Sequence, residues 1–211
     1  MSAIGVLGGT FDPVHNGHLR VALEMRNALS LSEVRLIPVG RPAHRSQPIA
    51  SGELRHSMLR WAVDGIRGLK VDDRELERAG ESFTVDTLAS LREEVGDTPI
   101  CLIIGMDQFH SLDQWHEWRK IIALAHICVA RRPGSAVPTD GPVAQLLSER
   151  QVSDPGRLHE AASGYIFLGA VPVLDISSTR IRALIARRQE PDFLLPRSVL
   201  EFIQTEGIYD E

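Results

Sequence analysis

Two histidines lie three residues apart in the segment GGTFDPVHNGHL, which begins at Gly8. The segment follows an apolar run and precedes a pattern typical of an amphipathic helix over residues 17–29. A glycine turn lets the backbone approach a ligand closely, and the first N–H groups of a helix are free to bind an anion. Imidazoles at such a place donate hydrogen bonds to phosphate oxygens on which charge builds up. The segment therefore predicts a phosphate site at Gly8, Gly9, Thr10, His15 and His18.

Other roles for the same residues are left open at this point. Each histidine could cap the helix or lie on its surface. The pair could also bind zinc, but zinc-binding histidines on a helix are usually four residues apart, and no Cys or carboxylate cluster nearby completes the site. The glycines match neither the dinucleotide fingerprint nor the P-loop. We therefore favour phosphate and predict no metal held by protein side chains.

A second candidate phosphate site is the heptapeptide ISSTRIR near the end of the chain. Its hydroxyl residues could simply cap a helix with nothing bound. Arg182, however, lies three residues after Thr179 on the same helix face, and helical side chains lean toward the N-terminus. Its guanidinium can then reach the space in front of Ser177 and Ser178 and bind an anion bidentately, whereas Arg180 points elsewhere. We predict that the two segments bind opposite ends of one polyphosphate.

The composition excludes several classes of protein. The chain has 211 residues, of which 43% are hydrophobic, and a net charge of −5. Broad nucleic-acid binding needs a basic face, which this charge argues against. Neither a run of ~18–20 apolar residues nor a signal-peptide pattern is present, so we expect a cytoplasmic protein without membrane or nucleic-acid partners. Cys101 and Cys128 lie inside apolar runs, which favours buried thiols over a disulfide.

Short apolar runs alternate with helical patterns along the chain. The pattern predicts strands at residues 3–8, 33–39, 69–73, 99–105, 126–130, 164–169 and 171–176. It predicts helices at about residues 17–29, 51–66, 84–95, 115–124, 178–188 and 196–205. The alternation indicates an α/β fold: a Rossmann-like doubly wound parallel sheet with helices on both faces and a small C-terminal helical part.

A stretch rich in Pro, Gly and Ser, residues 132–157, interrupts this pattern. We expect a loop-rich surface insertion there, with one short helix at about residues 143–150. The chain would then be a single domain over residues 1–211, with its C-terminal helical segment starting at about residue 176. Ligands of such sheets bind beyond the carboxyl ends of the strands, where the strand order reverses.

The two motifs together closely resemble those of the HxGH-type nucleotidyltransferases, specifically the bacterial nicotinate-nucleotide adenylyltransferases. The resemblance covers nearly the whole chain and includes GRPAHR, ESFTVDTL, LIIGMD, DQWHEW, VARRPG and LLPRSVLEFIQTEGIY. It implies transfer of the adenylyl group of ATP to nicotinate mononucleotide, which gives nicotinic acid adenine dinucleotide and pyrophosphate, a step of NAD biosynthesis. The attacking phosphate is already ionised, so catalysis would consist of positioning and charge stabilisation.

The resemblance also implies roles for individual residues. The catalytic residues would be His15, His18 and Arg182. ATP would contact Gly8, Gly9, Thr10, Phe11, His15, His18, Ser177, Ser178, Thr179 and Arg182, and it would carry Mg²⁺ with it. Nicotinate mononucleotide would contact His44, Arg45, Thr84, Asp107, Trp115 and Arg132, with Trp115 stacked on the pyridine ring.

Alternatives remain within this assignment. Trp115 could be a half-buried core aromatic, and Thr84 could simply cap its helix. The rival activities are another HxGH adenylyltransferase, such as phosphopantetheine adenylyltransferase, a cytidylyltransferase, and a module that binds ATP without turnover. The sequence leaves open the preference for the acid over the amide mononucleotide and whether the chain forms homo-oligomers. The other histidines match no motif and are expected to be structural: His56, His110, His116, His126 and His159.

Overall fold

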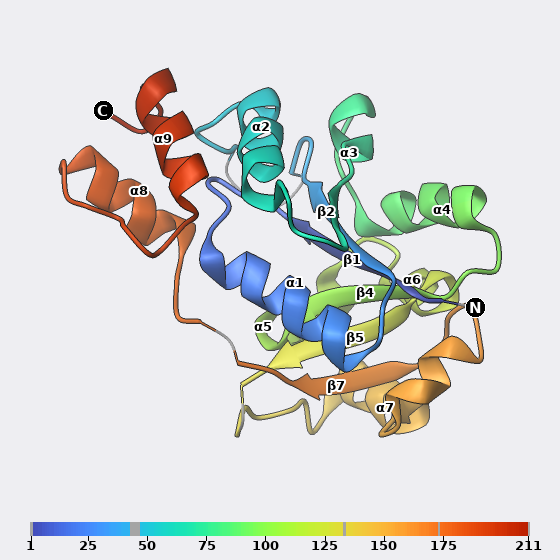
Figure 1. The fold of residues 1–211 in the computed structure, drawn as a ribbon. Helices are drawn as coiled ribbons and strands as arrows, with labels where there is room; N and C mark the ends of the chain where they lie inside the picture. Colours follow the sequence, from blue (N-terminus) through green and yellow to red (C-terminus); the bar gives the residue numbers. More distant parts are fainter. Residues whose placement is uncertain (1, 43–46, 133, 173, 211) are drawn as a thin grey trace.

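Parallel strands form a seven-stranded sheet at the centre of the molecule (Figure 1). The computed structural model describes residues 2–42, 47–132, 134–172 and 174–210. The strand order is β3-β2-β1-β4-β5-β7-β6, and it reverses between β1 and β4. The strands are β1 (Ile4–Gly9), β2 (Glu33–Pro38), β3 (Leu69–Val71), β4 (Ile100–Gly105), β5 (His126–Arg131), β6 (Gln151–Val152) and β7 (Ile166–Ala170). The predicted α/β fold with a doubly wound parallel sheet is confirmed.

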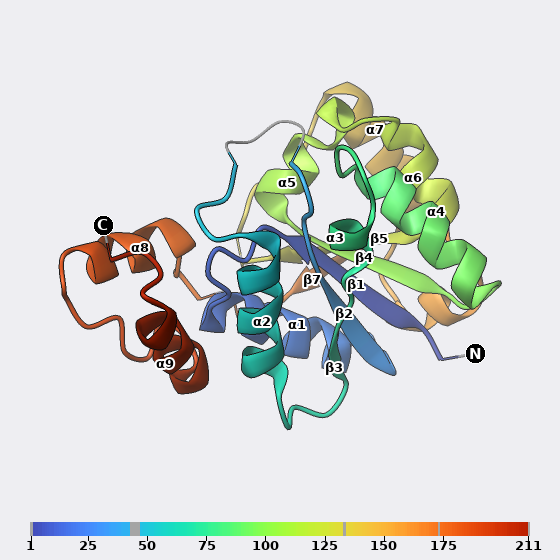
Figure 2. The same ribbon diagram turned by 90° about the horizontal axis from the view of Figure 1, so that it is seen from above.

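Helices cover both faces of this sheet (Figures 1 and 2). One face carries α1 (Asn16–Ala28) and α2 (Gly52–Val63); the other carries α4 (Thr84–Val95), α5 (Met106–His110), α6 (Trp118–Leu124) and α7 (Gly141–Arg150). The α9 helix (Arg197–Glu206) packs beside α2, and α8 (Ser178–Ala186) lies farther out, away from the sheet. Shorter elements are α3 (Arg74–Glu77) and the 3₁₀ helices η1 (Leu112–Gln114) and η2 (Pro155–His159). Within the described ranges, no helix is long and apolar enough to cross a membrane.

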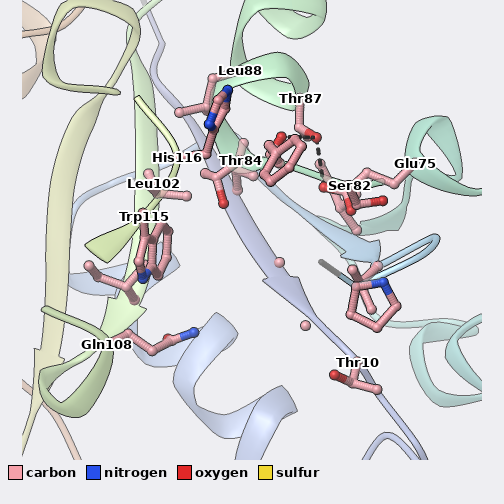
Figure 3. Close-up of a pocket in the computed structure, with 18 of the residues that line it drawn as sticks. Thr10, Glu75, Ser82, Thr84, Thr87, Leu88, Leu102, Gln108, Trp115 and His116 are labelled. Atoms are coloured by element: carbon pink, nitrogen blue, oxygen red, sulfur yellow. Dashed lines mark hydrogen bonds between the residues drawn. The ribbon is translucent and has the colours of Figure 1, made fainter. Parts of the chain in front are cut away.

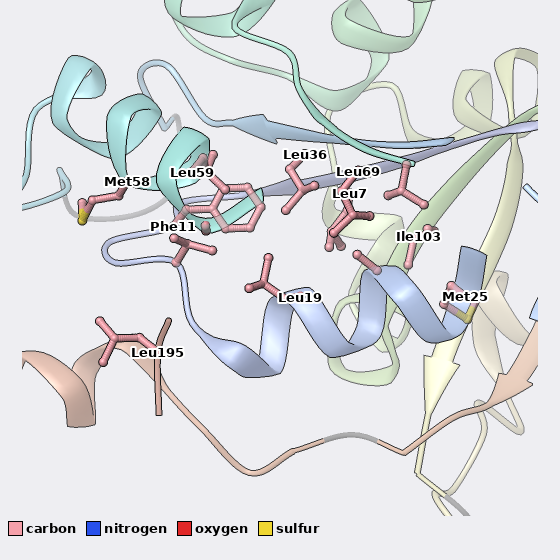
Figure 4. Packing of buried hydrophobic residues seen from close by; sticks show 14 of the residues in the cluster. Leu7, Phe11, Leu19, Met25, Leu36, Met58, Leu59, Leu69, Ile103 and Leu195 are labelled. Carbon is pink, nitrogen blue, oxygen red and sulfur yellow. The ribbon is translucent and has the colours of Figure 1, made fainter. Parts of the chain in front are cut away.

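Alternate residues of the strands pack into two cores, one on each face. Leu7 and Ile103 point toward α1, where they meet Leu19 and Met25 (Figure 4). Their strand neighbours point to the opposite face and pack against α4 and α6; among them are Val6, Leu102 and Ile104. Side chains alternate in this way because successive Cβ atoms of a strand point to opposite faces. Cys101 and Cys128 are buried and free, as predicted.

The strand predicted at residues 171–176 is wrong. None of the described residues in this stretch belongs to a strand, and Leu174 is 43% exposed. The N–H of Val171 donates to the carbonyl oxygen of Arg131 at 3.2 Å, beside the ladder between β5 and β7. Pro172 has no N–H to continue that ladder. The segment instead leaves the sheet and leads to α8.

The insertion at residues 132–157 is more ordered than a loop with one helix. The predicted helix is present as α7, and its residues Val143 and Leu147 pack in the core on the α4 face. Directly after α7, β6 pairs in parallel with β7 and forms the sheet edge. A strand of two residues is too short to show an alternating pattern, so the sequence could not indicate it.

The helix predicted at residues 115–124 begins later, at Trp118. The predicted first residue, Trp115, instead follows η1 in an extended conformation. The orientation of the Trp115 side chain is therefore set by the end of η1 and not by a longer helix. This local path decides where the tryptophan lies in the candidate site.

Candidate active site

The rings of His15 and His18 stack at the start of α1. Their centroids are 3.6 Å apart and their planes differ by 21°. Nδ1 of His18 accepts a hydrogen bond from the backbone N–H of His15 at 3.3 Å, which places the proton of the neutral His18 ring on Nε2. Gly17 makes room for this stack, because a Cβ there would lie 3.0 Å from the His15 ring. Phe11 is buried and contacts the His18 ring edge-on, with centroids 4.9 Å apart.

Both imidazoles are neutral at pH 7. His15 is only 6% exposed, and burial lowers its pKa to about 4. Burial, with the neighbouring His15 as a second cause, also holds the pKa of His18 well below its usual value. Among the described residues, Nδ1 of His15 is buried and has no hydrogen-bond partner. Buried polar atoms are nearly always paired, so this nitrogen is an exception among the described side chains.

The start of α8 lies against the loop that leads into α1. The hydroxyl of Ser178 donates to the carbonyl oxygen of Pro13 at 2.9 Å. Arg182 donates from Nη1 to the carbonyl oxygen of Asp12 at 2.6 Å and from Nη2 to Oγ1 of Thr179 at 3.4 Å. The guanidinium therefore does lean back toward the helix start. The two predicted phosphate segments are brought together, as the sequence indicated.

Ser177 has the capping role that was considered as an alternative. Its hydroxyl accepts a hydrogen bond from the backbone N–H of Arg180 at 3.3 Å. It is exposed, as is Thr179. Capping and phosphate binding do not exclude each other, because the remaining N–H groups at the helix start still point outward.

A cavity of about 570 Å³ opens at the carboxyl ends of β1, β2 and β4 (Figure 3). It lies where the strand order reverses, the position expected for ligands of such sheets. Gly8, Gly9 and Thr10 line one part of it. A Cβ on Gly8 would meet no atom within 4 Å, so the backbone there faces open space.

Aromatic rings line another part of this cavity. Trp115 is half-buried and borders it together with Thr84, the first residue of α4 (Figure 3). The ring of His116 packs against Phe83, with centroids 4.4 Å apart, and both also line the cavity. His116 matched no motif and was expected to be structural, and the structure places it at the edge of the cavity. Its place next to Trp115 in the chain was the available signal.

A buried carboxyl group that the sequence did not indicate also lines the cavity. Glu75, on α3, is 8% exposed and accepts a hydrogen bond from the hydroxyl of Thr87 at 2.7 Å. Burial raises its pKa. Ser82 accepts the N–H of Gly40 at 3.1 Å, and a Cβ on Gly40 would overlap the carbonyl oxygen of Glu75. These contacts join the end of β2, α3 and the start of α4 beside the cavity.

Two of the predicted mononucleotide contacts, Asp107 and Arg132, do not line the cavity. Asp107, on α5, is exposed, and its neighbour Gln108 lines the cavity instead. Arg132 follows β5, and its Nη2 pairs with Oδ1 of Asp175 at 3.1 Å between exposed side chains. His44 and Arg45 lie outside the described residues. The short α5, which the sequence did not reveal, decides which residue after β4 faces inward.

Metal ligands are scarce in this region. In the part of the chain that the structure describes, no group of three or more His, Cys, Asp and Glu side chains is placed to hold a metal ion. His15 and His18 also stack on each other rather than converging on one point. This arrangement does not match the tetrahedral geometry of a zinc site.

Comparisons with known proteins agree with this architecture. Residues 6–184 match the family model described as cytidylyltransferase-like. A "probable nicotinate-nucleotide adenylyltransferase" of Aeromonas salmonicida is 45% identical over 206 residues, which are 98% of this chain and 96% of the relative. A protein of the same name from Methylococcus capsulatus is 45% identical over 207 residues, which are 98% of this chain and 99% of the relative.

The fold is also found among solved structures. The Plasmodium falciparum nicotinic acid mononucleotide adenylyltransferase complexed with NaAD superposes with a TM-score of 0.74 at 17% identity, covering 100% of this chain and 98% of that chain. At this identity the likeness supports the fold. The two bacterial relatives show the family of this chain, because each is 45% identical to it over nearly its whole length. The chain belongs to the cytidylyltransferase-like family and, within it, to the bacterial nicotinate-nucleotide adenylyltransferases.

Proposed function

We propose that this chain transfers the adenylyl group of ATP to nicotinate mononucleotide, forming nicotinic acid adenine dinucleotide and pyrophosphate. The observation that carries the proposal is the contact of the start of α8 with the loop before α1, next to the turn at Gly8, Gly9 and Thr10 that lines a cavity bordered by Trp115. Two features of the relatives support it. The curated relatives are named for this activity, and the similar solved structure is complexed with NaAD.

The reaction needs little covalent chemistry from the protein. A phosphate oxygen of the mononucleotide attacks the α-phosphorus of ATP, and a new P–O bond forms. The bond between the α-phosphorus and the bridging oxygen breaks, and its electron pair leaves with pyrophosphate. The nucleophile is ionised at pH 7, so no general base is required. Neutral imidazoles suit this reaction, because they can donate hydrogen bonds to the phosphates.

The phosphates of ATP would lie between the two helix starts. His18 would donate from Nε2 to the α-phosphate or the leaving pyrophosphate, and His15 would support it through the stacked rings. Arg182 would bind the β- and γ-phosphates, because its present contacts use only part of its N–H donors. Ser177, Ser178 and Thr179 would contribute the N-terminal groups of α8.

The glycine turn would accommodate the rest of the triphosphate. Gly8 and Gly9 would offer backbone groups to the ligand, with Thr10 beside them. Phe11 would act by supporting the His18 ring, because its own ring is buried. Mg²⁺ would arrive bound to the triphosphate and keep water and phosphate oxygens as ligands.

Nicotinate mononucleotide would occupy the aromatic part of the cavity. The volume of about 570 Å³ is within the usual range for a small-molecule site. Trp115 would stack on the pyridine ring, and the ring carboxylate would accept the backbone N–H of Thr84 at the start of α4. From the family resemblance, Asp107 would bind the ribose, and His44, Arg45 and Arg132 would serve the anionic groups.

Product identification tests this function. The purified chain is incubated with MgATP and nicotinate mononucleotide, and the products are separated and weighed by mass spectrometry. We expect nicotinic acid adenine dinucleotide and pyrophosphate in equal amounts. Parallel reactions with nicotinamide mononucleotide, with phosphopantetheine and with CTP in place of ATP test the rival activities. Faster turnover in any of these reactions, or ATP binding without any dinucleotide product, would contradict the proposal.

A further inference from the structure

Asp12 is a buried carboxylate between the two predicted phosphate segments. It is 4% exposed. Its Oδ2 accepts the N–H of Ile49 at 2.8 Å, and its Oδ1 accepts the N–H of Ala50 at 3.1 Å. A buried charge is tolerated when such donors surround it. These two backbone donors hold the carboxylate from the side of residues 49–50.

The third donor to Asp12 comes from the last part of the chain. The hydroxyl of Tyr209 donates to Oδ1 of Asp12 at 2.6 Å, across 197 residues. Tyr209 is 8% exposed and packs, with Ile208, in the core that also holds Val14 and Ile181. Burial and the adjacent carboxylate raise the pKa of Tyr209, so its hydroxyl keeps the proton and remains a donor.

Asp12 contacts the guanidinium of Arg182 on its other side. Nη1 of Arg182 donates to the carbonyl oxygen of Asp12 at 2.6 Å and lies 3.8 Å from its Oδ2. The Arg182 side chain is 24% exposed, so it still borders solvent where a phosphate would lie. The direction of this arginine therefore depends on how Asp12 is held.

We propose that the hydroxyl of Tyr209, acting through Asp12, positions the guanidinium of Arg182 for the phosphates of ATP. Tyr209 occupies one oxygen of the carboxylate, which limits the pull of Asp12 on Arg182. Without that hydroxyl, the carboxylate turns toward its nearest charged donor, and the arginine is drawn away from the ligand. Tyr209 is thus a positioning residue rather than a catalytic one. The inference rests on the proposed function, because it concerns the same phosphate site.

The variant Tyr209→Phe removes this hydroxyl with little change of volume. We expect kcat to fall about tenfold and the Kd of MgATP to rise, because a hydrogen bond to a charged group is lost. The KM for nicotinate mononucleotide should stay within about twofold. Tyr165→Phe is the matched control, because its hydroxyl accepts from Arg157 at the surface, at 3.0 Å, and this variant should behave as wild type.

A double-mutant cycle separates positioning from general loosening of the C-terminal segment. If Tyr209 acts through Arg182, adding Tyr209→Phe to Arg182→Ala should change neither kcat nor the MgATP Kd further. Ile208→Val loosens the same packing but keeps the hydroxyl, and it should leave both constants near wild type. All variants are compared at a temperature where circular dichroism shows them to be folded.

Two results would overturn the inference. One is a Tyr209→Phe variant whose kcat and MgATP Kd equal those of the wild type. The other is a double variant in which the effects of Tyr209→Phe and Arg182→Ala multiply. The readouts also separate this inference from the proposed function. If the wild-type chain makes no dinucleotide, the proposed function fails, and the cycle is then read from the MgATP Kd alone. If the wild type is active and the cycle is multiplicative, only the inference fails.

Discussion

The hydroxyl of Ser178 donates a hydrogen bond to the carbonyl oxygen of Pro13 at 2.9 Å, joining two segments that are 165 residues apart. This contact places the start of α8 beside the loop that leads into α1. Each helix start carries a partial positive charge and outward N–H groups. A protein with a net charge of −5 can bind a polyanion there, because the attractive groups are concentrated at one place.

The first prediction concerns His18. Replacing it by alanine removes an Nε2 donor from the site where charge develops, so kcat should fall by about 10²–10³. The KM for nicotinate mononucleotide should remain within about twofold. Steady-state kinetics give both values. His56→Ala is the control: this histidine is on α2 and lies 3.9 Å from Asp73, so its loss should leave turnover unchanged. Near-normal turnover of His18→Ala at saturating substrates would show that the assigned role is wrong.

The second prediction concerns Trp115. The variant Trp115→Ala should raise the KM for nicotinate mononucleotide about tenfold, because ring stacking is worth ~1–3 kcal/mol. The KM for ATP should not change. Trp115→Phe should restore part of the loss, and Trp61→Ala, at a position on α2 that is 51% exposed, should have no effect. An equal rise of both KM values would instead indicate a structural role for Trp115.

The third prediction tests the backbone of Thr84 rather than its side chain. Thr84 is the first residue of α4, and Phe83 before it is extended, with φ −118° and ψ 138°. Proline is tolerated at this helix position, and it favours an extended preceding residue. Thr84→Pro therefore removes the N–H donor together with the hydroxyl, and it should raise the KM for nicotinate mononucleotide at least tenfold. Thr84→Ala keeps the donor and should stay near wild type. Similar KM values for the two variants would rule out the N–H contact.

The fourth prediction concerns pH and stability. The pKa of His15 is lowered from 6.5 to about 4 by burial. The unfolded chain therefore binds more protons between these values, and folding stability falls as the pH decreases through that window. At pH 5 the free energy of unfolding should be lower by about 2 kcal/mol than at pH 7.5 because of this residue. Urea titrations at both pH values measure the change.

His15→Gln provides the control for this effect, because glutamine does not titrate. Between pH 7.5 and pH 5, the free energy of unfolding of this variant should fall by about 2 kcal/mol less than that of the wild type. A residual slope is expected, since burial also lowers the pKa of His18 and His126. An identical pH dependence of the two proteins would contradict the assigned pKa.

The sequence predicted those parts of the site that depend on regular geometry. The position of Arg182 three residues after Thr179 predicted that its guanidinium turns back, and the two side chains are hydrogen-bonded at 3.4 Å. The glycine turn after β1 and the histidine spacing likewise predicted the start of α1. Such relations depend only on the helix repeat and on the strand that precedes it.

The remaining parts depend on short irregular elements. Gln108 and His116 line the cavity because α5 and η1 turn the chain locally, and these elements have only five and three residues. The apolar run at residues 171–176 resembles a strand, but Pro172 cannot continue the ladder. Glu75 reaches the cavity through tertiary packing of α3. Patterns of a few residues carry too little periodicity to predict such placements.

The central claim is that one triphosphate binds between the starts of α1 and α8. A crystal structure with Mg²⁺ and a hydrolysis-resistant ATP analogue tests it directly. We predict phosphate oxygens of the same ligand at hydrogen-bond distance, about 2.7–3.2 Å, from both Nε2 of His18 and the guanidinium of Arg182. A triphosphate that contacts only one of these groups, or binds elsewhere on the molecule, would contradict the claim.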